Sequence, residues 1–252
     1  MSAQTQTAVI LAAGWGSRVQ GLSQNGEPLS KPLIRLNNEP MVVRVIRTLA
    51  AAGITRIIAV TGYLTERVEK EVKALSSPTL SVETVFNPRW DTLANGVSLL
   101  TAKEMLSGPF MLCMSDHVFD IGIARDLIQE GSKGMAVRLC IDRKLETIFD
   151  MDDATKVLTQ GERIVDIGKT IADYNAVDAG VFFCETDILQ SLDAVLEAKG
   201  DCSLSDGMKR LGQSGRFGYL DIGSRIWQDV DTPETLRYAE KLLADGLIHF
   251  PN

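Results

Sequence analysis

Apolar and polar positions alternate in blocks that predict strands and helices in turn over the first half of the chain. An apolar run over 8–13 is short enough for a buried strand and ends at Gly14. The further elements expected here are a helix over 40–52, a strand over 56–60, a helix over 65–75, a strand over 81–86, a helix over 90–105 and a strand over 110–114. This order favours right-handed crossovers and a mostly parallel sheet covered on both faces.

The pattern changes after about Met135, where strands and turns become more frequent. The elements expected here are a strand over 135–141, a hairpin of 155–158 and 163–167 that turns at 160–161, a strand over 176–184, helices over 186–198 and 204–211, a strand over 217–220 and a helix over 233–244. No linker rich in Pro, Gly or Ser separates the two halves. We therefore expect a single domain over 1–252, with one part over about 1–134 and a second over about 135–252.

Composition narrows the class of protein. The chain has 252 residues, 45% of them hydrophobic, which is ample for one sizeable core. A net charge of −7 disfavours a nucleic-acid-binding surface, although a local basic pocket remains compatible with it. Apolar runs stay shorter than the ~20 residues of a membrane helix, and the N-terminus lacks signal-peptide features, so we expect a cytoplasmic protein without membrane contact. The four cysteines form no C-x-x-C pair and are expected to be reduced core residues.

A glycine-containing loop follows the first predicted strand and is the strongest candidate for binding phosphate. Gly14 and Gly16 carry no Cβ atoms that would keep their N–H groups away from an anion, and Arg18 and Lys31 add positive charge on either side. A strand-ending turn with two solvated cations is the alternative. The loop is not a dinucleotide-binding fingerprint, because Val19 stands where the third glycine would be, and no G-K-[ST] of a P-loop follows.

Carboxylates lie where strands of the predicted sheet end. The Gly14 loop, residues 61–63 and residues 115–117 each follow a strand, so they should converge on one rim of the sheet. Asp116 comes directly after an apolar strand and suits Mg²⁺, which prefers one or two carboxylates plus substrate phosphates. Asp229 and Asp231 share one face of an extended segment, but Asp231 also precedes Thr232-Pro233, where capping of the next helix is the alternative.

Three further polar segments are candidates for contacts with ligands. Asn95 and Ser98, with Gly96 between them, can approach a base or a ribose, or else cap a helix. Asp152 and Lys156 can serve the hydroxyls and the phosphate of an acceptor, or else form an exposed charged turn. Asp178 and Gly180 stand at the start of a strand. His117 and His249 are interpreted as structural, since neither is paired in sequence with a nucleophile.

Several motifs run in order through almost the whole chain: L-A-A-G-x-G-S-R, K-P-L, N-G-V-S-L-L, S-D-H, D-D-A-T-K-V, D-A-G-V-F and D-V-D-T-P-E. In them the chain resembles the nucleotidyltransferases, and within these the CTP:inositol-1-phosphate cytidylyltransferase branch. It is also similar to phosphonate and phosphocholine cytidylyltransferases. The resemblance implies an α/β fold of the nucleotide-diphospho-sugar transferase type. This is a Rossmann-like three-layer sandwich with a mostly parallel mixed sheet and a small β subregion on the acceptor side.

The resemblance also implies an activity: Mg²⁺-dependent transfer of CMP from CTP to a phosphorylated or phosphonate small alcohol, first of all inositol 1-phosphate, with release of pyrophosphate. It assigns Arg18 and Lys31 to catalysis, and the metal to Asp116 and Asp231, with Asp229 less favoured. The residues it implies for the nucleotide are Leu11, Ala12, Ala13, Gly14, Gly16, Ser17, Gly62, Asn95, Gly96 and Ser98. Those it implies for the acceptor are Lys156, Asp178, Gly180 and Asp152.

Other functions stay open at this point. The acceptor of a cytidylyltransferase could instead be 2-hydroxyethylphosphonate, 2-aminoethylphosphonate or phosphocholine, and a sugar 1-phosphate nucleotidyltransferase is a further alternative. A non-catalytic nucleotide-sensing subunit is the alternative of another class, against which the joint presence of Arg18, Lys31, Asp116 and Asp231 argues. A downstream enzyme, separate or fused, is an expected partner. Single residues determine neither the choice of base nor the oligomeric state.

Overall fold

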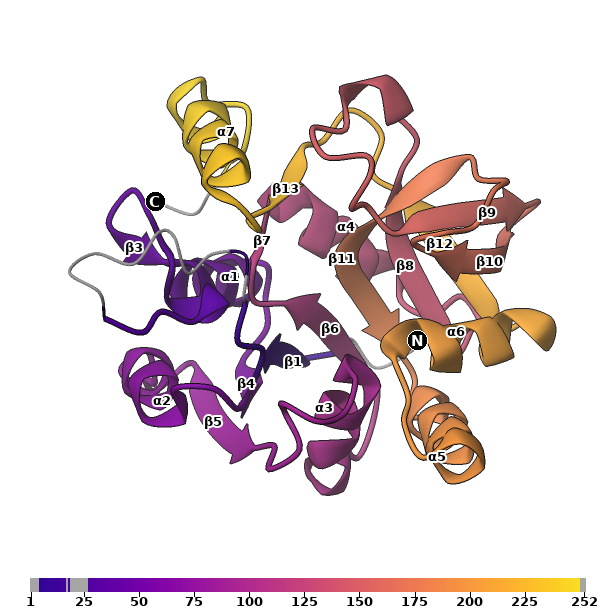
Figure 1. Ribbon diagram of the computed structural model, residues 1–252, viewed down its shortest axis with the longest axis horizontal. Coiled ribbons are helices and arrows are strands. Elements are labelled where there is room, and N and C mark those ends of the chain that lie inside the picture. Colours follow the sequence, from indigo (N-terminus) through magenta and orange to yellow (C-terminus); the bar gives the residue numbers. More distant parts are fainter. Residues whose placement is uncertain (1–4, 17, 19–26, 250–252) are drawn as a thin grey trace.

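A nine-stranded sheet forms the centre of the computed structural model, which describes residues 5–16, 18 and 27–249 (Figure 1). Its first four strands are parallel and pair in the order β5-β4-β1-β6. Their bounds are β1 Thr7–Ala12, β4 Arg56–Thr61, β5 Ser81–Phe86 and β6 Phe110–Met114. Helices α1 Met41–Ala51 and α2 Thr65–Lys73 lie in the connections between these strands, and the parallel pairing places the carboxyl ends of β1 and β4 at one rim.

The second half of the chain extends the same sheet in the order β11-β8-β12-β10-β9. These strands are β8 Val137–Asp142, β9 Lys156–Gln160, β10 Arg163–Gly168, β11 Ala176–Cys184 and β12 Phe217–Asp221. All strands of the sheet run in one direction except β10 and β11. Because β9 also pairs with β11, the five strands close into a ring of pairings. The predicted mixed, mostly parallel sheet with a small β subregion is confirmed.

Strand side chains alternate between two hydrophobic clusters, as a sheet covered on both faces requires. Ala8 and Ile10 of β1 pack with α1, α2 and α4 (Ile121–Glu130), whereas Val9 and Leu11 pack with α3, α5 and α6. The latter helices are α3 Asn95–Thr101, α5 Asp187–Lys199 and α6 Leu204–Gln213. All four cysteines are buried and free, as expected. Among the described helices none is long and apolar enough to span a membrane.

The helix predicted over 90–105 is much shorter than expected. Residues 90–94 form turns, α3 begins only at Asn95, and the chain after Thr101 continues as a separate 3-10 turn, Lys103–Met105. The Asp201 carboxylate accepts a hydrogen bond from the Ala94 amide (2.8 Å), so a distant loop fixes the start of α3. Apolar spacing alone could not show that contact.

Short elements beside the sheet were not predicted from the sequence. Strand β7, His117–Phe119, pairs antiparallel with β13, Trp227–Asp229, and the predicted helix over 233–244 is confirmed as α7, Pro233–Ala244, which follows β13. The remaining short elements are β2 Arg35–Leu36, β3 Glu39–Pro40 and the 3-10 turns Lys31–Leu33 and Leu145–Thr147. The β7–β13 pair matters most, because it joins the segment after β6 to the C-terminal segment.

We expect Asp206→Asn to lower the free energy of unfolding by about 0.5–1 kcal/mol near pH 7, the usual range for a capping contact. Asp206 forms a capping box with Ser203 at the start of α6. Hydrogen bonds from Lys199 and Ser203 lower the pKa of Asp206 to about 2, below its ordinary value of 3.8. This contribution is therefore present above pH 4 and is lost as the pH falls toward 2. Denaturant titrations at several pH values should show the deficit of the variant shrinking over that range; a constant deficit would contradict the assignment.

Candidate active site

Two adjoining cavities open at the rim of the sheet. The first, here called the loop cavity, has a volume of about 340 Å³ and contains Gly14, Gly16, Trp90 and Ser98 in its wall. The second, here called the hairpin cavity, has a volume of about 260 Å³ and lies toward β9, β10 and β11. Their walls share Arg18, Lys31, Asn95, Met114 and Asp116. Two ligands, one in each cavity, would therefore lie against the same two cations and the same carboxylate.

The loop cavity contains most of the residues predicted for a nucleotide. Leu11, Ala13 and Gly14 stand at the end of β1, and Gly16 adopts a φ of +68°, a left-handed conformation that favours glycine. Asn95 and Ser98 come from the first turns of α3 on the opposite wall. Ser17 lies outside the described residues. The predicted convergence of the strand ends is thus seen for the Gly14 loop and for the segment after β6.

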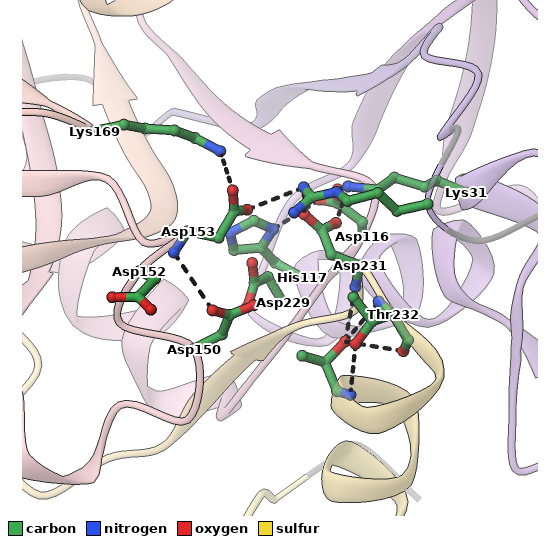
Figure 2. A network of polar contacts seen from close by, with 12 residues as sticks. Lys31, Asp116, His117, Asp150, Asp152, Asp153, Lys169, Asp229, Asp231 and Thr232 are labelled. Atoms are coloured by element: carbon green, nitrogen blue, oxygen red, sulfur yellow. Dashed lines mark hydrogen bonds and ion pairs between the residues drawn. The ribbon is translucent and has the colours of Figure 1, made fainter.

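The two cations are held between carboxylates that come from three distant segments (Figure 2). The Lys31 ammonium donates to Oδ2 of Asp116 (2.7 Å) and is ion-paired with Asp231. The Arg18 guanidinium donates to Asp153 (3.0 Å) and to Asp231. Arg18 and Lys31 therefore lie together at the junction of the cavities, with Asp231 between them.

The β7–β13 pair brings the two predicted acidic motifs together. Asp229 pairs in register with His117, and the Val230 amide donates to the Asp116 carbonyl (2.9 Å). Asp231 then precedes α7, where the side chain of Thr232, not that of Asp231, caps the helix. The capping alternative for Asp231 is therefore wrong, and the residue that caps α4 is Asp120.

The acidic side chains differ in charge state because their surroundings differ. Burial opposes ionisation of Asp116, but Lys31 and His117 outweigh it and hold the pKa of this carboxyl well below its ordinary value. Burial raises the pKa of Asp178 to about 6, although the Gly180 amide and His117 oppose this shift. Burial, together with Asp116, also raises the pKa of Asp229. The hairpin cavity thus combines carboxylates with a lowered pKa, Asp116 and Asp153, with two that hold protons more readily, Asp178 and Asp229.

Carboxylate oxygens of Asp153, Asp229 and Asp231 all lie within 4.8 Å of one another, a group that could hold a metal ion. Asp116 stands on the other side of Lys31, which contacts both Asp116 and Asp231. Oxygen ligands of this kind suit a hard divalent cation such as Mg²⁺. The donor set therefore fits the metal expected from the sequence, with Asp153 as an additional ligand candidate.

Two of the four residues predicted for the acceptor line the hairpin cavity, and two do not. Asp178 and Gly180 line the hairpin cavity, and the Gly180 amide donates to Asp178 (2.7 Å). Lys156 does not: its side chain is buried, and its ammonium donates to the Asp152 carbonyl (3.0 Å). Asp152 is likewise absent from both walls, and Figure 2 shows its carboxylate turned away from the other acids.

Lys169 and Asp153, rather than Lys156 and Asp152, line the hairpin cavity. The Lys169 ammonium donates to Asp153 (2.7 Å), and both residues line the hairpin cavity. The sequence signal was the adjacent acidic pair at 152–153, but which of two neighbours in a turn faces inward depends on the local backbone. Nothing in the sequence marked Lys169, which follows β10 in an ordinary polar loop.

Three residues predicted for the nucleotide are packing residues. A Cβ atom on Gly62 would lie 2.5 Å from the Ala13 carbonyl oxygen and 2.6 Å from Trp90, so Gly62 supports the glycine loop from beneath. Gly96 donates to the Cys202 carbonyl (3.1 Å) and packs against the α5–α6 connection. Ala12 is buried in the sheet. None of these three lines either cavity, which corrects their prediction as contact residues.

His117 is a further residue of the site that sequence reasoning missed. Its imidazole lines the hairpin cavity, and Nδ1 lies 2.7 Å from Oδ1 of Asp116. Burial lowers the pKa of His117, but the negative charges of Asp116, Asp229 and Asp178 raise it by more. The net shift of this pKa is therefore upward. Its position directly after Asp116 was the available signal. By contrast, His249 contacts Asp120 near the surface and lines neither cavity.

Comparisons with known proteins agree with this geometry. Two similar proteins, both named bifunctional IPC transferase and DIPP synthase, come from Rubrobacter xylanophilus and Thermococcus kodakarensis. They are 35% identical over 241 residues and 34% identical over 239 residues, covering 94% of this chain in each case. The same alignments cover 51% and 50% of those proteins, so this chain spans about half their length.

The fold is shared with solved structures. The inositol-1-phosphate CTP transferase from T. maritima superposes with a TM-score of 0.81 at 24% identity, covering 99% of this chain and 100% of that chain. This likeness supports the predicted fold class. Residues 8–206, which include the glycine loop, Asp116 and strands β8 to β11, match the model of the MobA-like NTP transferase domain. The chain is a nucleotidyltransferase of the MobA-like NTP transferase domain family.

Proposed function

We propose that this protein transfers CMP from CTP to the phosphate of a small polyol, first of all inositol 1-phosphate, and releases pyrophosphate. The observation that carries the proposal is the shared wall of the two cavities, where Arg18, Lys31 and Asp116 meet. Two proteins similar over nearly the whole chain are named IPC transferases, and a similar solved structure is an inositol-1-phosphate CTP transferase. These names support the choice of CTP and of the acceptor.

In the proposed reaction, an acceptor phosphate oxygen forms a bond to the α-phosphorus of CTP. The bond from the α-phosphorus to the bridging oxygen of the β-phosphate breaks, and pyrophosphate leaves with the electron pair. The attacking oxygen is already anionic, so no general base is required. The protein must instead bring two anions together and stabilise the charge that accumulates between them.

The cations at the cavity junction are suited to stabilising that charge. We propose that backbone N–H groups of the Gly14–Gly16 loop bind the triphosphate, and that Arg18 and Lys31 hold the charge of the departing pyrophosphate. Asp116 and Asp231, with Asp153 and Asp229 beside them, would hold Mg²⁺. An ion bound there would neutralise part of the phosphate charge.

Asn95 lines both cavities. Its side-chain carbonyl accepts a hydrogen bond from the Leu204 amide (2.9 Å), which fixes α3 against α6.

The hairpin cavity suits a neutral polyol with one phosphate. Lys169 offers a cation at its entrance, while Asp178 and Asp229 offer carboxylate oxygens to hydroxyl groups deeper inside. Phe182, Met208 and Trp227 supply the apolar part of the wall. A carboxylate in the cavity accepts hydrogen bonds from the hydroxyl groups of the acceptor. It disfavours analogues without those hydroxyl groups, because the free energy cost of removing water from the carboxylate is then not offset by a hydrogen bond.

The function is tested by a panel of four nucleotides against several acceptors, with pyrophosphate release as the readout. The acceptors are inositol 1-phosphate, 2-hydroxyethylphosphonate, 2-aminoethylphosphonate, phosphocholine and glucose 1-phosphate, with Mg²⁺ present throughout. We expect the highest kcat/KM for CTP with inositol 1-phosphate. A higher value for another pair reassigns the substrates, and nucleotide binding without any pyrophosphate release would favour a nucleotide-sensing role.

Lys169→Met should raise KM for the acceptor by about 10- to 100-fold, the equivalent of one lost hydrogen bond to a charged group. KM for the nucleotide should change little, because Lys169 lines the hairpin cavity but not the loop cavity. Lys156→Met is the matched control, since Lys156 is a buried lysine of the same hairpin that lines neither cavity. Steady-state kinetics with each substrate varied in turn gives both constants. Equal effects of the two variants would contradict the assignment of Lys169.

A further inference from the structure

The imidazole of His117 is held by a hydrogen bond at one edge and by a stacking contact on one face. At one edge, Nδ1 lies 2.7 Å from Oδ1 of Asp116. On one face, the ring stacks on the indole of Trp227, with centroids 5.5 Å apart and an interplanar angle of 11°. The His117 side chain is only 15% exposed. The ring is therefore held in one orientation between the hairpin cavity and Asp116.

Trp227 is in turn fixed from behind. Its Nε1 donates to Oδ2 of Asp142 (3.1 Å), a carboxylate that is 3% exposed. The Lys144 ammonium donates to the other oxygen of Asp142 (2.8 Å) and to the Gly223 carbonyl (2.7 Å). Polar groups buried this deeply are costly unless they are paired, so the set specifies one position for the indole. Because the imidazole of His117 stacks on this indole, the position of the imidazole is fixed as well.

Gly180 provides the space for the other edge of the ring. A Cβ atom at Gly180 would lie 2.3 Å from Cδ2 and 2.5 Å from Nε2 of His117, a contact that real side chains do not make. Gly180 also has a φ of +72°, in the left-handed region that favours glycine. The predicted acceptor-side glycine therefore lets the imidazole lie flat beside strand β11.

We infer that His117 is a positioning residue whose Nδ1–H holds Oδ1 of Asp116, so that Oδ2 is the oxygen presented at the cavity junction. Oδ2 is the atom that Lys31 contacts in this structure. A carboxylate on a single bond to Cβ rotates unless a donor fixes it, and partners behind a ligand typically change metal affinity by about 10- to 100-fold. The inference rests on the proposed function, in which Asp116 holds the divalent cation.

The amide of asparagine can take the place of Nδ1, whereas that of glutamine lies closer to the place of Nε2. We therefore expect His117→Asn to bind Mn²⁺ within about threefold of the wild-type affinity, while His117→Gln and His117→Ala bind it about 10- to 100-fold more weakly. Electron paramagnetic resonance titration of free Mn²⁺ with the full chain measures this directly, without turnover. His249→Asn is the matched control, because His249 also contacts a carboxylate through Nδ1 (Asp120, 2.6 Å) but is far more exposed.

A second pair of variants separates the role of the ring from a general loss of stability. Gly180→Ala introduces both left-handed strain and the clash with His117. Gly161→Ala introduces only strain, since Gly161 has a φ of +57° and nothing within 4 Å of the added Cβ. Both variants should melt at a lower temperature than the wild type, and Gly180→Ala, which adds the clash, at the lower temperature of the two. Only Gly180→Ala should also lose Mn²⁺ affinity, by a factor close to that of His117→Ala.

The outcomes distinguish this inference from the proposed function. Mn²⁺ affinity unchanged in His117→Gln and His117→Ala, equal loss in His117→Asn and His117→Ala, or no Mn²⁺ site in the wild-type protein would each overturn the positioning role. If instead no nucleotide and acceptor pair gives pyrophosphate while Mn²⁺ binding still depends on His117, the transfer reaction is wrong and the positioning role stands. Thermal unfolding of each variant shows whether it is folded at the temperature of the titration.

Discussion

Lys31→Met will lower kcat/KM by about a thousandfold and at the same time strengthen the binding of divalent cations to the free protein. The loss of rate follows from removing a preorganised cation at the point where two anions meet, an effect of about 10²–10³ for one electrostatic group. The gain in cation binding has a different cause. The Lys31 ammonium lies between Asp116 and Asp231 and contacts both. In the protein without substrates, the Lys31 ammonium therefore occupies the space between these two carboxylates. It also neutralises the negative charge that would otherwise attract a metal ion.

The same substitution should cost stability that a metal ion restores. Without Lys31 the carboxylates of Asp116 and Asp231, whose side chains are 16% and 7% exposed, face each other with less compensation. Removing one partner of a buried ion pair typically costs about 3–5 kcal/mol, and partial exposure here should keep the loss toward the lower end. Adding Mg²⁺ should raise the melting temperature of Lys31→Met more than that of the wild type.

Lys103→Met is the control for these measurements. Lys103 also pairs with an aspartate (Asp193, 2.7 Å), but on the surface and away from both cavities. It should change neither the Mn²⁺ affinity nor the rate. If Lys31→Met loses activity but binds Mn²⁺ no more tightly than the wild type, the ammonium does not compete with the cation and the assignment of Asp116 and Asp231 as its ligands fails.

Asp116→Asn should lower kcat/KM by about 10²- to 10³-fold with KM for the acceptor changed little. Asp116 is the carboxylate shared by both cavity walls, and Lys31 and His117 keep its pKa low, so that it is ionised at any working pH. Asparagine keeps the shape but removes the charge. Kinetics at increasing Mg²⁺ concentration should show that saturating metal restores only part of the lost rate.

Parallel variants decide between the two C-terminal aspartates. Asp231→Asn should resemble Asp116→Asn, and the double variant should be no worse than about tenfold below either single one, because groups that act as a unit are not additive. Asp229→Asn should instead act mainly on KM for the acceptor, since burial raises the pKa of Asp229 and so makes its carboxylate a weaker ligand for a cation. Asp120→Asn, a buried aspartate that caps α4, should cost stability but not rate. A rate effect of Asp229→Asn equal to that of Asp231→Asn would reverse the assignment.

Much of the site was predictable because strand ends in a parallel sheet share one rim. Gly14, Ser115 and Asp116 each follow a buried apolar run, and the structure brings them into one cavity wall. Prediction failed where a side chain's direction depends on a turn. Asp152 and Lys156 were chosen from a charged segment in which Asp153 and Lys169 are the residues that face the hairpin cavity. Gly62 and Gly96 failed for a related reason, because a glycine needed for close packing looks the same in sequence as one needed for a ligand.

The sequence by itself determined the sheet, its two helical layers and the glycine loop, because apolar periodicity and glycine positions act locally, over one strand or one turn. The tertiary structure alone decided how the charges are shared. The β7–β13 pair places Asp229 beside His117 and carries Asp231 to Lys31, across more than a hundred residues of chain. Burial raises the pKa values of Asp178 and Asp229, whereas Lys31 and His117 keep that of Asp116 low. Electrostatic interactions depend on distance and desolvation in space, and neither is written in the spacing of residues along a chain.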